Sequence, residues 1–284
     1  LIEISNQVAD MIKFQAHQKG LELLLNIAPE IPSFVKVDAV RLRQVLVNLL
    51  GNAVKFTQKG EIEFKIEFLG LNKTGASDFR FSIRDSGVGI LPQNQNKIFE
   101  AFSQEDSSTT RKFGGTGLGL TISNKLLALM GSRLKLVSEP GVGSTFYFDV
   151  SFQATKGTNI TESNIDNIKS VLIVDDNDHN RFILKEILAY KQISSTEASG
   201  GEDAINLIKK GNQYEAILMD YHMPGMDGIE TVRKIRKIID PYSDENPVIL
   251  LYSSSEDDKV NEACAELNIR HRLIKPIKMQ QLFD

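Results

Sequence analysis

Two kinds of apolar run divide this 284-residue sequence. In the second half, the runs "SVLIVDD", "EAILMD", "PVILLYS" and "RLIKP" alternate with segments of helical periodicity. Such runs are typical of parallel strands that are buried on both faces and connected by helices. In the first half, "EIEFKIEF" and "FRFSIRD" alternate strictly, which indicates strands with one buried face. The sequence therefore predicts two α/β domains, one with helices on one side of its sheet and one doubly wound.

A polar segment separates the two patterns. Residues 153–168, "QATKGTNITESNIDNI", lack periodicity and are rich in Asn, Thr and Ser, which is typical of a linker. We therefore expect one domain at residues 1–152 and another at 169–284. The chain starts without a methionine and stops within a helical pattern, so we expect it to be a piece of a larger protein.

Properties of the whole chain argue against several other classes of protein. The formal net charge is −4 and Lys and Arg are not clustered, so we expect no nucleic-acid partner. The longest apolar runs are too short to cross a bilayer. The single cysteine, Cys264, excludes an internal disulfide and fits a reducing compartment, where it is expected to be a small buried hydrophobic residue. We expect this piece to be cytoplasmic.

The segment "DAVRLRQVLVNLLGNAVKFT" predicts a helix with Asp38 as its N-cap and one apolar face, at positions 42, 45, 46, 49, 50 and 53. The opposite stripe recurs at spacings of three or four and consists of Arg41, Gln44, Asn48, Asn52 and Lys55. A polar stripe is usually a solvated face. Exposed helices favour Glu and Lys over Asn, however, so two asparagines beside a lysine favour a functional face.

Asp85 ends the strand "FRFSIRD" on the same parity as Phe79, Phe81 and Ile83. A carboxylate that faces an apolar crevice is costly unless hydrogen-bond donors meet it. The simpler alternative is an exposed loop aspartate before "SGVG", because turns favour Asp. The inward parity instead favours an acceptor for an N–H group of a ligand.

Four glycines lie within six positions just before an apolar helical segment: Gly114, Gly115, Gly117 and Gly119. Their amides are expected to gather at a helix N-terminus, which is a natural site for an anion. A lone glycine-rich loop is weak evidence for any one ligand. Here, however, it belongs to an ordered series of five motifs: "NLLGNAVKF", "DSGVGI", "IFEAF", "GGTGLGL" and "GVGSTF".

This series resembles the catalytic, ATP-binding domain of sensor histidine kinases. The resemblance implies an α/β sandwich shared with gyrase, mismatch-repair proteins and a heat-shock chaperone, with ATP and Mg²⁺ as ligands. It implies that Asn52 binds the Mg²⁺ on the triphosphate, that Lys55 contacts phosphate and that Asp85 accepts the adenine amino group. Residues of about 93 to 116, with Phe99 and Phe102, would form a mobile lid. The other implied ATP-binding residues are Gly87, Gly89, Gly115, Thr116, Gly117, Leu118, Gly119 and Thr145.

Asn48 stands where the hydrolytic relatives carry a glutamate general base. Because an amide cannot take a proton from water, the sequence predicts transfer of the γ-phosphoryl group to a better nucleophile. The expected catalytic residues are Asn48, Asn52 and Lys55. The resemblance implies a histidine acceptor on a dimerising helical hairpin. The chain has four histidines: His17, His179, His222 and His271. None of them has the sequence context of that acceptor, so we expect the hairpin to lie outside this chain.

Carboxylates end two apolar runs of the second half, with Asp175 and Asp176 after one and Asp220 after another. Ligands of open parallel sheets bind at this edge. Three carboxylates that meet there require a divalent cation such as Mg²⁺. Three separate helix-capping aspartates are the simpler alternative. That alternative does not explain the adjacent pair or Lys275, a cation at the end of the last run.

Residues 169–284 resemble the receiver domain of two-component systems, which has a flavodoxin-like fold. The resemblance implies that Asp220 is the phosphoacceptor, that Asp175 and Asp176 bind Mg²⁺ together with it, and that Lys275 contacts the phosphoryl group. A hydroxyl is expected at the end of "PVILLYSSS". Counting back from Lys275 by the family's usual interval gives Ser253, whereas counting forward from Pro247 gives Tyr252. We choose Ser253. Arg272 occupies the family's aromatic switch position, so we expect a different readout of phosphorylation.

Together the two resemblances imply a hybrid sensor histidine kinase. ATP-dependent autophosphorylation of a histidine would be followed by phosphotransfer to Asp220. The implied partners are the protein's own dimerisation hairpin, in a homodimer, and a downstream histidine-phosphotransfer protein or response regulator. The full-length protein would be membrane-anchored. The alternative is a docking module that nucleotide and phosphorylation control without catalysis, but the intact motifs favour the kinase.

Overall fold

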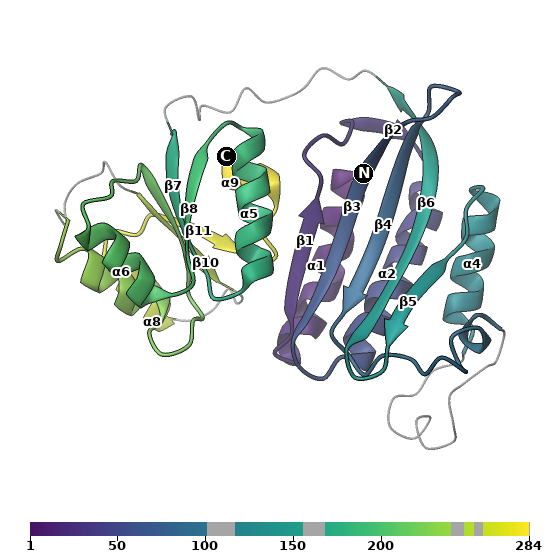
Figure 1. Cartoon of the computed structure of the whole chain (residues 1–284), viewed down its shortest axis with the longest axis horizontal. Coiled ribbons are helices and arrows are strands. Elements are labelled where there is room, and N and C mark those ends of the chain that lie inside the picture. The colour runs from purple at the N-terminus through teal and green to yellow at the C-terminus, as the bar shows by residue number, and fades with distance from the viewer. Residues whose placement is uncertain (101–116, 156–167, 240–246, 253–257, 284) are drawn as a thin grey trace. The chain divides into compact units, whose positions relative to one another are not determined.

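The computed structural model describes residues 1–100, 117–155, 168–239, 247–252 and 258–283. The chain divides into two compact units, Leu1–Ile160 and Thr161–Asp284, which Figure 1 shows in purple to teal and in green to yellow.

The first unit is built on a six-stranded sheet with the order β1-β3-β4-β6-β2, to which β5 adds by pairing with β6. Only β1 and β3 pair in parallel, and the other pairs are antiparallel. Along β4, buried and half-buried residues alternate without interruption, so the predicted one-faced strand is confirmed. The strands are β1 (Glu22–Ile27), β2 (Phe34–Lys36), β3 (Glu61–Leu71), β4 (Ser77–Asp85), β5 (Lys135–Glu139) and β6 (Gly143–Thr155).

Helices α1 (Ile2–Gln18), α2 (Ala39–Phe56) and α4 (Gly119–Leu129) pack with the buried face of this sheet around one hydrophobic core. In Figure 1, α1 and α2 lie behind the strands. Four phenylalanines from β3, β4 and β6 form the centre of the core, and each is at most 1% exposed: Phe64, Phe79, Phe81 and Phe148. A short 3-10 helix, η1 (Lys97–Phe99), precedes the segment that is not described.

Both ends of α2 are fixed by side chains. Asp38 is the N-cap, as predicted, and its carboxylate accepts the backbone N–H of Arg41 at 3.1 Å. At the other end, the Lys19 ammonium donates to the carbonyls of Val54 at 2.6 Å and Lys55 at 3.1 Å. A cation that binds the last carbonyls of a helix also complements the helix dipole. The helix is therefore held rigidly where its polar face begins and ends.

The second unit is a five-stranded sheet with the order β11-β10-β9-β7-β8, and all of its neighbouring strands are parallel. Numbered within the unit, this is the doubly wound 2-1-3-4-5 order, so the flavodoxin-like prediction is confirmed. The strands are β7 (Ser170–Val174), β8 (Ser194–Ala198), β9 (Ala216–Asp220), β10 (Val248–Tyr252) and β11 (His271–Ile274).

Helices cover both faces of this second sheet (Figure 1). Side chains of α6, α7 and α8 pack in one core, and those of α5 and α9 pack in the other. Cys264 is buried in the first of these cores, as expected, and burial raises the pKa of its thiol. The helices are α5 (Asp178–Tyr190), α6 (Gly201–Lys209), α7 (Gly228–Ile235), α8 (Asp258–Glu266) and α9 (Met279–Phe283).

Two differences from the sequence predictions occur at the edges of the sheets. Residues 153–155, predicted to start the linker, instead end β6 and pair with the edge strand β2. The run "RLIKP" was predicted to be buried on both faces, but β11 at the edge of its sheet is exposed or half-buried throughout. Edge positions lie outside the packed core, so polar residues are accepted there and the apolar pattern fades.

Candidate nucleotide and phosphoacceptor sites

Asp85 ends β4 on the buried face, as its parity predicted, and is 7% exposed. Its carboxylate accepts the backbone N–H of Gly87 at 2.9 Å and that of Ser144. Burial raises the pKa of Asp85, although these two amides and the charge of Arg84 act in the opposite direction. A buried carboxylate that its own donors do not fully stabilise is suited to accept a hydrogen bond from a ligand.

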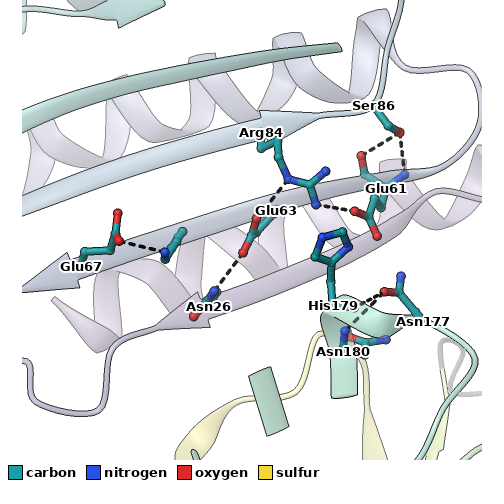
Figure 2. A network of polar contacts seen from close by, with 10 residues as sticks. Asn26, Glu61, Glu63, Glu67, Arg84, Ser86, Asn177, His179 and Asn180 are labelled. Atoms are coloured by element: carbon teal, nitrogen blue, oxygen red, sulfur yellow. Dashed lines mark hydrogen bonds and ion pairs between the residues drawn. The ribbon is translucent and has the colours of Figure 1, made fainter. Parts of the chain in front are cut away.

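The side chain of Arg84, which precedes Asp85 in β4, lies on the other face of the sheet. There the guanidinium is bound by Glu61 and, at 3.1 Å, by Glu63, which in turn accepts the amide of Asn26 at 2.9 Å (Figure 2). Two carboxylates therefore engage Arg84 away from Asp85. This leaves backbone amides as the principal donors to the Asp85 carboxylate.

The loop after Asp85 packs too closely against its neighbours for side chains at its glycines. A Cβ atom on Gly87 would lie 2.7 Å from the Phe56 carbonyl oxygen at the end of α2. A Cβ atom on Gly89, whose φ is +66°, would lie 2.0 Å from the Glu139 carbonyl oxygen. Any larger residue would push the loop away from α2 or from β5, so these glycines fix the position of the loop beside Asp85.

Two side chains that are not among the predicted site residues also hold this loop. Ser138 on β5 accepts the backbone N–H of Ile90 at 2.8 Å. Gln95 donates its amide to the carbonyls of Ile90 and Ser138, both at 3.0 Å. The loop is therefore cross-linked to the β5–β6 hairpin.

Thr145, predicted to bind ATP, lies away from Asp85. It pairs with Arg84 across the strands, whereas Ser144 pairs with Asp85. Successive residues of a strand point to opposite faces, so Thr145 shares the outer parity of Arg84. Ser144, which is 7% exposed, lies on the same side as Asp85, and its hydroxyl contacts that of Ser138 at 3.0 Å.

The polar stripe of α2 separates into two parts. Arg41 and Gln44 are exposed, and Arg41 pairs with the N-cap Asp38 at 3.1 Å. Asn48, Asn52 and Lys55 are half-buried. Burial also lowers the pKa of Lys55. The interpretation as a solvated face therefore holds for Arg41 and Gln44. The interpretation as a functional face is limited to the other three residues of the stripe.

Asn48 links α2 to α4. Its Nδ2 donates to the Ser123 hydroxyl at 2.9 Å, and a Cβ atom on Gly119 would lie 2.4 Å from its Oδ1. The N-cap of α4 is Leu118, whose apolar side chain makes no capping hydrogen bond, so the first amides of the helix can bind an anion. Gly119 thus lies beside Asn48, on the stripe of α2 that also carries Asn52 and Lys55. The predicted lid is described only up to residue 100, with Phe99 at the end of η1, and four predicted loop and lid residues lie outside the described ranges: Phe102, Gly114, Gly115 and Thr116.

In the second unit the predicted acidic cluster forms. Oxygen atoms of Asp175, Asp176 and Asp220 lie within 4.8 Å of one another, and this is a possible metal site within the described part of the chain. Asp175 and Asp220 are 0% and 2% exposed, and Asp176 is exposed. The Lys275 ammonium lies 2.9 Å from Asp175 Oδ2 and 2.7 Å from Asp220 Oδ1. Three carboxylates with oxygen ligands at this spacing fit Mg²⁺.

The cluster is held by the loop between β7 and α5. Asp175 accepts the backbone N–H of Asn177 at 2.8 Å on Oδ1 and the side-chain amide of Asn180 at 3.1 Å on Oδ2. Asn177 caps α5 by accepting the backbone N–H groups of His179 and Asn180 (Figure 2). Neither asparagine is among the site residues predicted from the sequence.

The remaining receiver predictions are only partly visible. Ser253 lies outside the described residues, while Tyr252 ends β10 and is half-buried, so the choice between the two hydroxyls stays a prediction. Arg272 is exposed on β11 and donates to Asn261 on α8. Within the ranges that the structure covers, no helix combines the length and apolar character needed to cross a membrane.

Both units match known families. Residues 37–154 match the histidine kinase-, DNA gyrase B- and HSP90-like ATPases, and residues 171–284 match the response regulator receiver domain. Sensor histidine kinase AruS of Pseudomonas aeruginosa is 32% identical over 284 residues, covering 99% of this chain and 28% of that protein. Sensory/regulatory protein RpfC of Xanthomonas campestris is 28% identical over 314 residues, covering 100% of this chain and 43% of that protein. The chain therefore spans less than half the length of either relative.

Proposed function

Because this chain consists of the ATPase domain and the receiver domain of a hybrid sensor histidine kinase, we propose that it takes part in a phosphorelay from ATP through a histidine to Asp220. The observation that carries the proposal is the buried cluster in which Lys275 lies between Asp175 and Asp220. A phosphoacceptor carboxylate needs such charge neutralisation, because an anion must approach an anionic phosphoryl group.

In the first domain, each part of ATP has a candidate partner. Asp85 accepts the adenine amino group, and the amides at the uncapped start of α4 take phosphate oxygens. Lys55 adds a positive charge, and Asn52 offers an oxygen to the Mg²⁺ that ATP brings. Asn48 cannot act as a general base, because its amide takes no proton from water and already donates to Ser123. The site is thus suited to transfer rather than hydrolysis.

In the second domain, an Asp220 oxygen attacks the phosphorus atom of a phosphohistidine. The P–N bond breaks as the new P–O bond forms, and the imidazole leaves as the neutral base after taking up a proton. Lys275 stabilises the negative charge in this transfer. Mg²⁺, when bound by Asp175, Asp176 and Asp220, supplies further electrostatic stabilisation of the phosphoryl oxygens.

The donor histidine is proposed to lie on a dimerisation hairpin outside this chain. The chain's own four histidines are exposed: His17, His179, His222 and His271. The further partners we propose are a second copy of the whole protein and a downstream histidine-phosphotransfer protein or response regulator. We also propose that this piece is cytoplasmic and that the whole protein is anchored in a membrane.

Acetyl phosphate, a small phosphodonor, tests the second domain without any kinase. We expect the chain to gain one phosphoryl group with Mg²⁺ present and none with EDTA, as measured by intact-mass spectrometry. Asp220→Asn should abolish the gain. If the wild-type chain gains no phosphoryl group while a control receiver does, the docking-module alternative replaces the relay.

Labelling with γ-³²P-ATP tests the first domain. The chain alone should form no acid-labile phosphohistidine, and it should form one on a dimerisation hairpin that is added in cis or in trans. Strong labelling of His17 in the isolated chain would contradict the proposed location of the acceptor.

A further inference from the structure

The start of α4 is held by neighbours rather than by a cap. The helix begins at Gly119 after the N-cap Leu118, whose side chain makes no capping hydrogen bond. The first amides of the helix therefore require partners from elsewhere. Under the function proposed above, the phosphates of ATP are those partners. The affinity for ATP then depends on what keeps this helix end in place before ATP arrives.

Asn48 on α2 contacts α4 at two points. Its Nδ2 donates to the Ser123 hydroxyl at 2.9 Å. Its Oδ1 lies so close to Gly119 that a Cβ atom there would approach it to 2.4 Å. Positions 119 and 123 are four residues apart and therefore lie on the same face of α4. Asn48 thus contacts the first turn of α4 along one face.

Ser123 lies at the interior end of this contact. It is 1% exposed, whereas Asn48 is half-buried. The Nδ2 group of Asn48 would lose an acceptor if the hydroxyl were removed, because alanine offers none. A donor left without a partner near the core is unfavourable, so the contact between Asn48 and α4 would rearrange.

The same face of α2 carries the other proposed phosphate ligands. Asn48, Asn52 and Lys55 follow one another at spacings of four and three, so they form one stripe on the helix. A shift of α4 relative to Asn48 would therefore also change the separation between the α4 amides and Lys55. Contacts to the triphosphate depend on that separation, whereas Asp85 and its glycine loop are held independently through Ser138 and Gln95.

We propose that Ser123 is a positioning residue for the triphosphate: acting through Asn48, it fixes the N-terminus of α4 against the polar face of α2. The inference rests on the proposed ATP site and adds a residue that touches no substrate atom. It predicts an effect on the phosphate part of the nucleotide and none on the base.

Ser123→Ala in the whole chain tests this inference, with ATP and adenosine as the two ligands. We expect the affinity for ATP to fall roughly five- to tenfold, as for the loss of one hydrogen bond that leaves a donor unsatisfied. The affinity for adenosine, measured by NMR titration, should stay unchanged. Ser5→Ala is the matched control, since Ser5 is also 1% exposed, lies on α1 and donates to the Leu1 carbonyl at 3.1 Å. It should leave both affinities unchanged.

A double-mutant cycle tests the route through Asn48. The variant Asn48→Ala/Ser123→Ala should bind ATP no more weakly than Asn48→Ala alone, because both variants lack the link. Additive losses would overturn the inference, as would equal losses for ATP and adenosine in Ser123→Ala. Unchanged ATP affinity in Ser123→Ala would overturn it and leave the proposed function standing. A wild-type chain that binds no ATP would overturn both.

Discussion

Replacing Lys275 by methionine removes the cation from between two buried carboxylates and nearly preserves the length of the side chain. The side chain of Lys275 is 12% exposed, and those of Asp175 and Asp220 are 0% and 3% exposed. Removing one partner of a buried ion pair typically costs about 3–5 kcal/mol of unfolding free energy, because the other charge remains buried without compensation. We expect a loss of this size for the second unit when EDTA is present.

A surface pair provides the matched control. Lys185 pairs with Glu197 at 2.7 Å, but their side chains are 51% and 33% exposed. Exposed pairs of this kind contribute little to stability because water screens their charges, so Lys185→Met should cost far less than Lys275→Met. The contrast between the two variants isolates burial, since each replaces one paired lysine with methionine.

Magnesium should distinguish the two variants further. Without Lys275, the carboxylates repel one another more strongly and have more to gain from a cation. Stabilisation by a ligand grows as its affinity rises, reaching about 2.7 kcal/mol when the ligand is at 100 times its Kd. We therefore expect Mg²⁺ to stabilise Lys275→Met more than the wild-type chain.

Urea unfolding followed by circular dichroism, with EDTA and with excess Mg²⁺, measures these differences for the transition that responds to the metal. Equal losses in Lys275→Met and Lys185→Met would refute the argument from burial. Equal Mg²⁺ stabilisation of Lys275→Met and wild type would show that the lysine does not share the charge of the metal site.

Four further predictions concern the two sites. Asp85→Asn should lower ATP affinity at least about tenfold, since a charged acceptor is lost, and calorimetry would detect this; unchanged affinity would exclude Asp85. Burial raises the pKa of Asp85, so its ionised carboxylate destabilises the folded state at pH 7. Asp85→Asn should therefore melt at a higher temperature than the wild-type chain at pH 7. This difference should disappear below pH 3.8, the ordinary pKa of the group, where the wild-type carboxyl is protonated in both the folded and the unfolded state. Burial lowers the pKa of Lys55, so its ammonium loses its charge as the pH rises toward 10.5, the ordinary pKa of a lysine. ATP affinity should fall over this range in the wild-type chain but not in Lys55→Met. Asn180→Ala should weaken Mg²⁺ binding by roughly tenfold in a titration, because Asn180 orients Asp175; Asn261→Ala is its control.

Strand parity and strand ends made several site residues predictable. Asp85 follows Phe79, Phe81 and Ile83 on the buried face, and a strand fixes this alternation whatever surrounds it. The same reasoning applied to "GSTFYF" would have selected Ser144, which shares the parity of Phe146 and Phe148. In the second unit, Asp175, Asp220 and Lys275 each end or follow a strand, and neighbouring parallel strands bring such ends together.

The supporting residues could not be predicted in this way. Ser123, Ser138 and Asn180 act on elements that are distant in sequence or through a loop whose path only the fold defines. A serine within a helix or strand gives no local signal that its hydroxyl will be an acceptor for a remote group. The polar edge strand β8 was also missed, because Ser194–Ala198 has too few apolar residues to form a recognisable run.

The buried carboxylates of the two sites have different hydrogen-bond donors, and this difference affects how each site responds to a ligand. Asp85 receives uncharged backbone donors from Gly87 and Ser144, so a nucleotide that donates to it relieves part of the cost of burial. Asp220 already has the Lys275 ammonium at 2.7 Å. A phosphoryl group on Asp220 would bring negative oxygens into competition for that ammonium, which also holds Asp175 at 2.9 Å. We therefore expect nucleotide binding to add a contact in the first domain, and phosphorylation to redistribute existing contacts around Lys275 in the second.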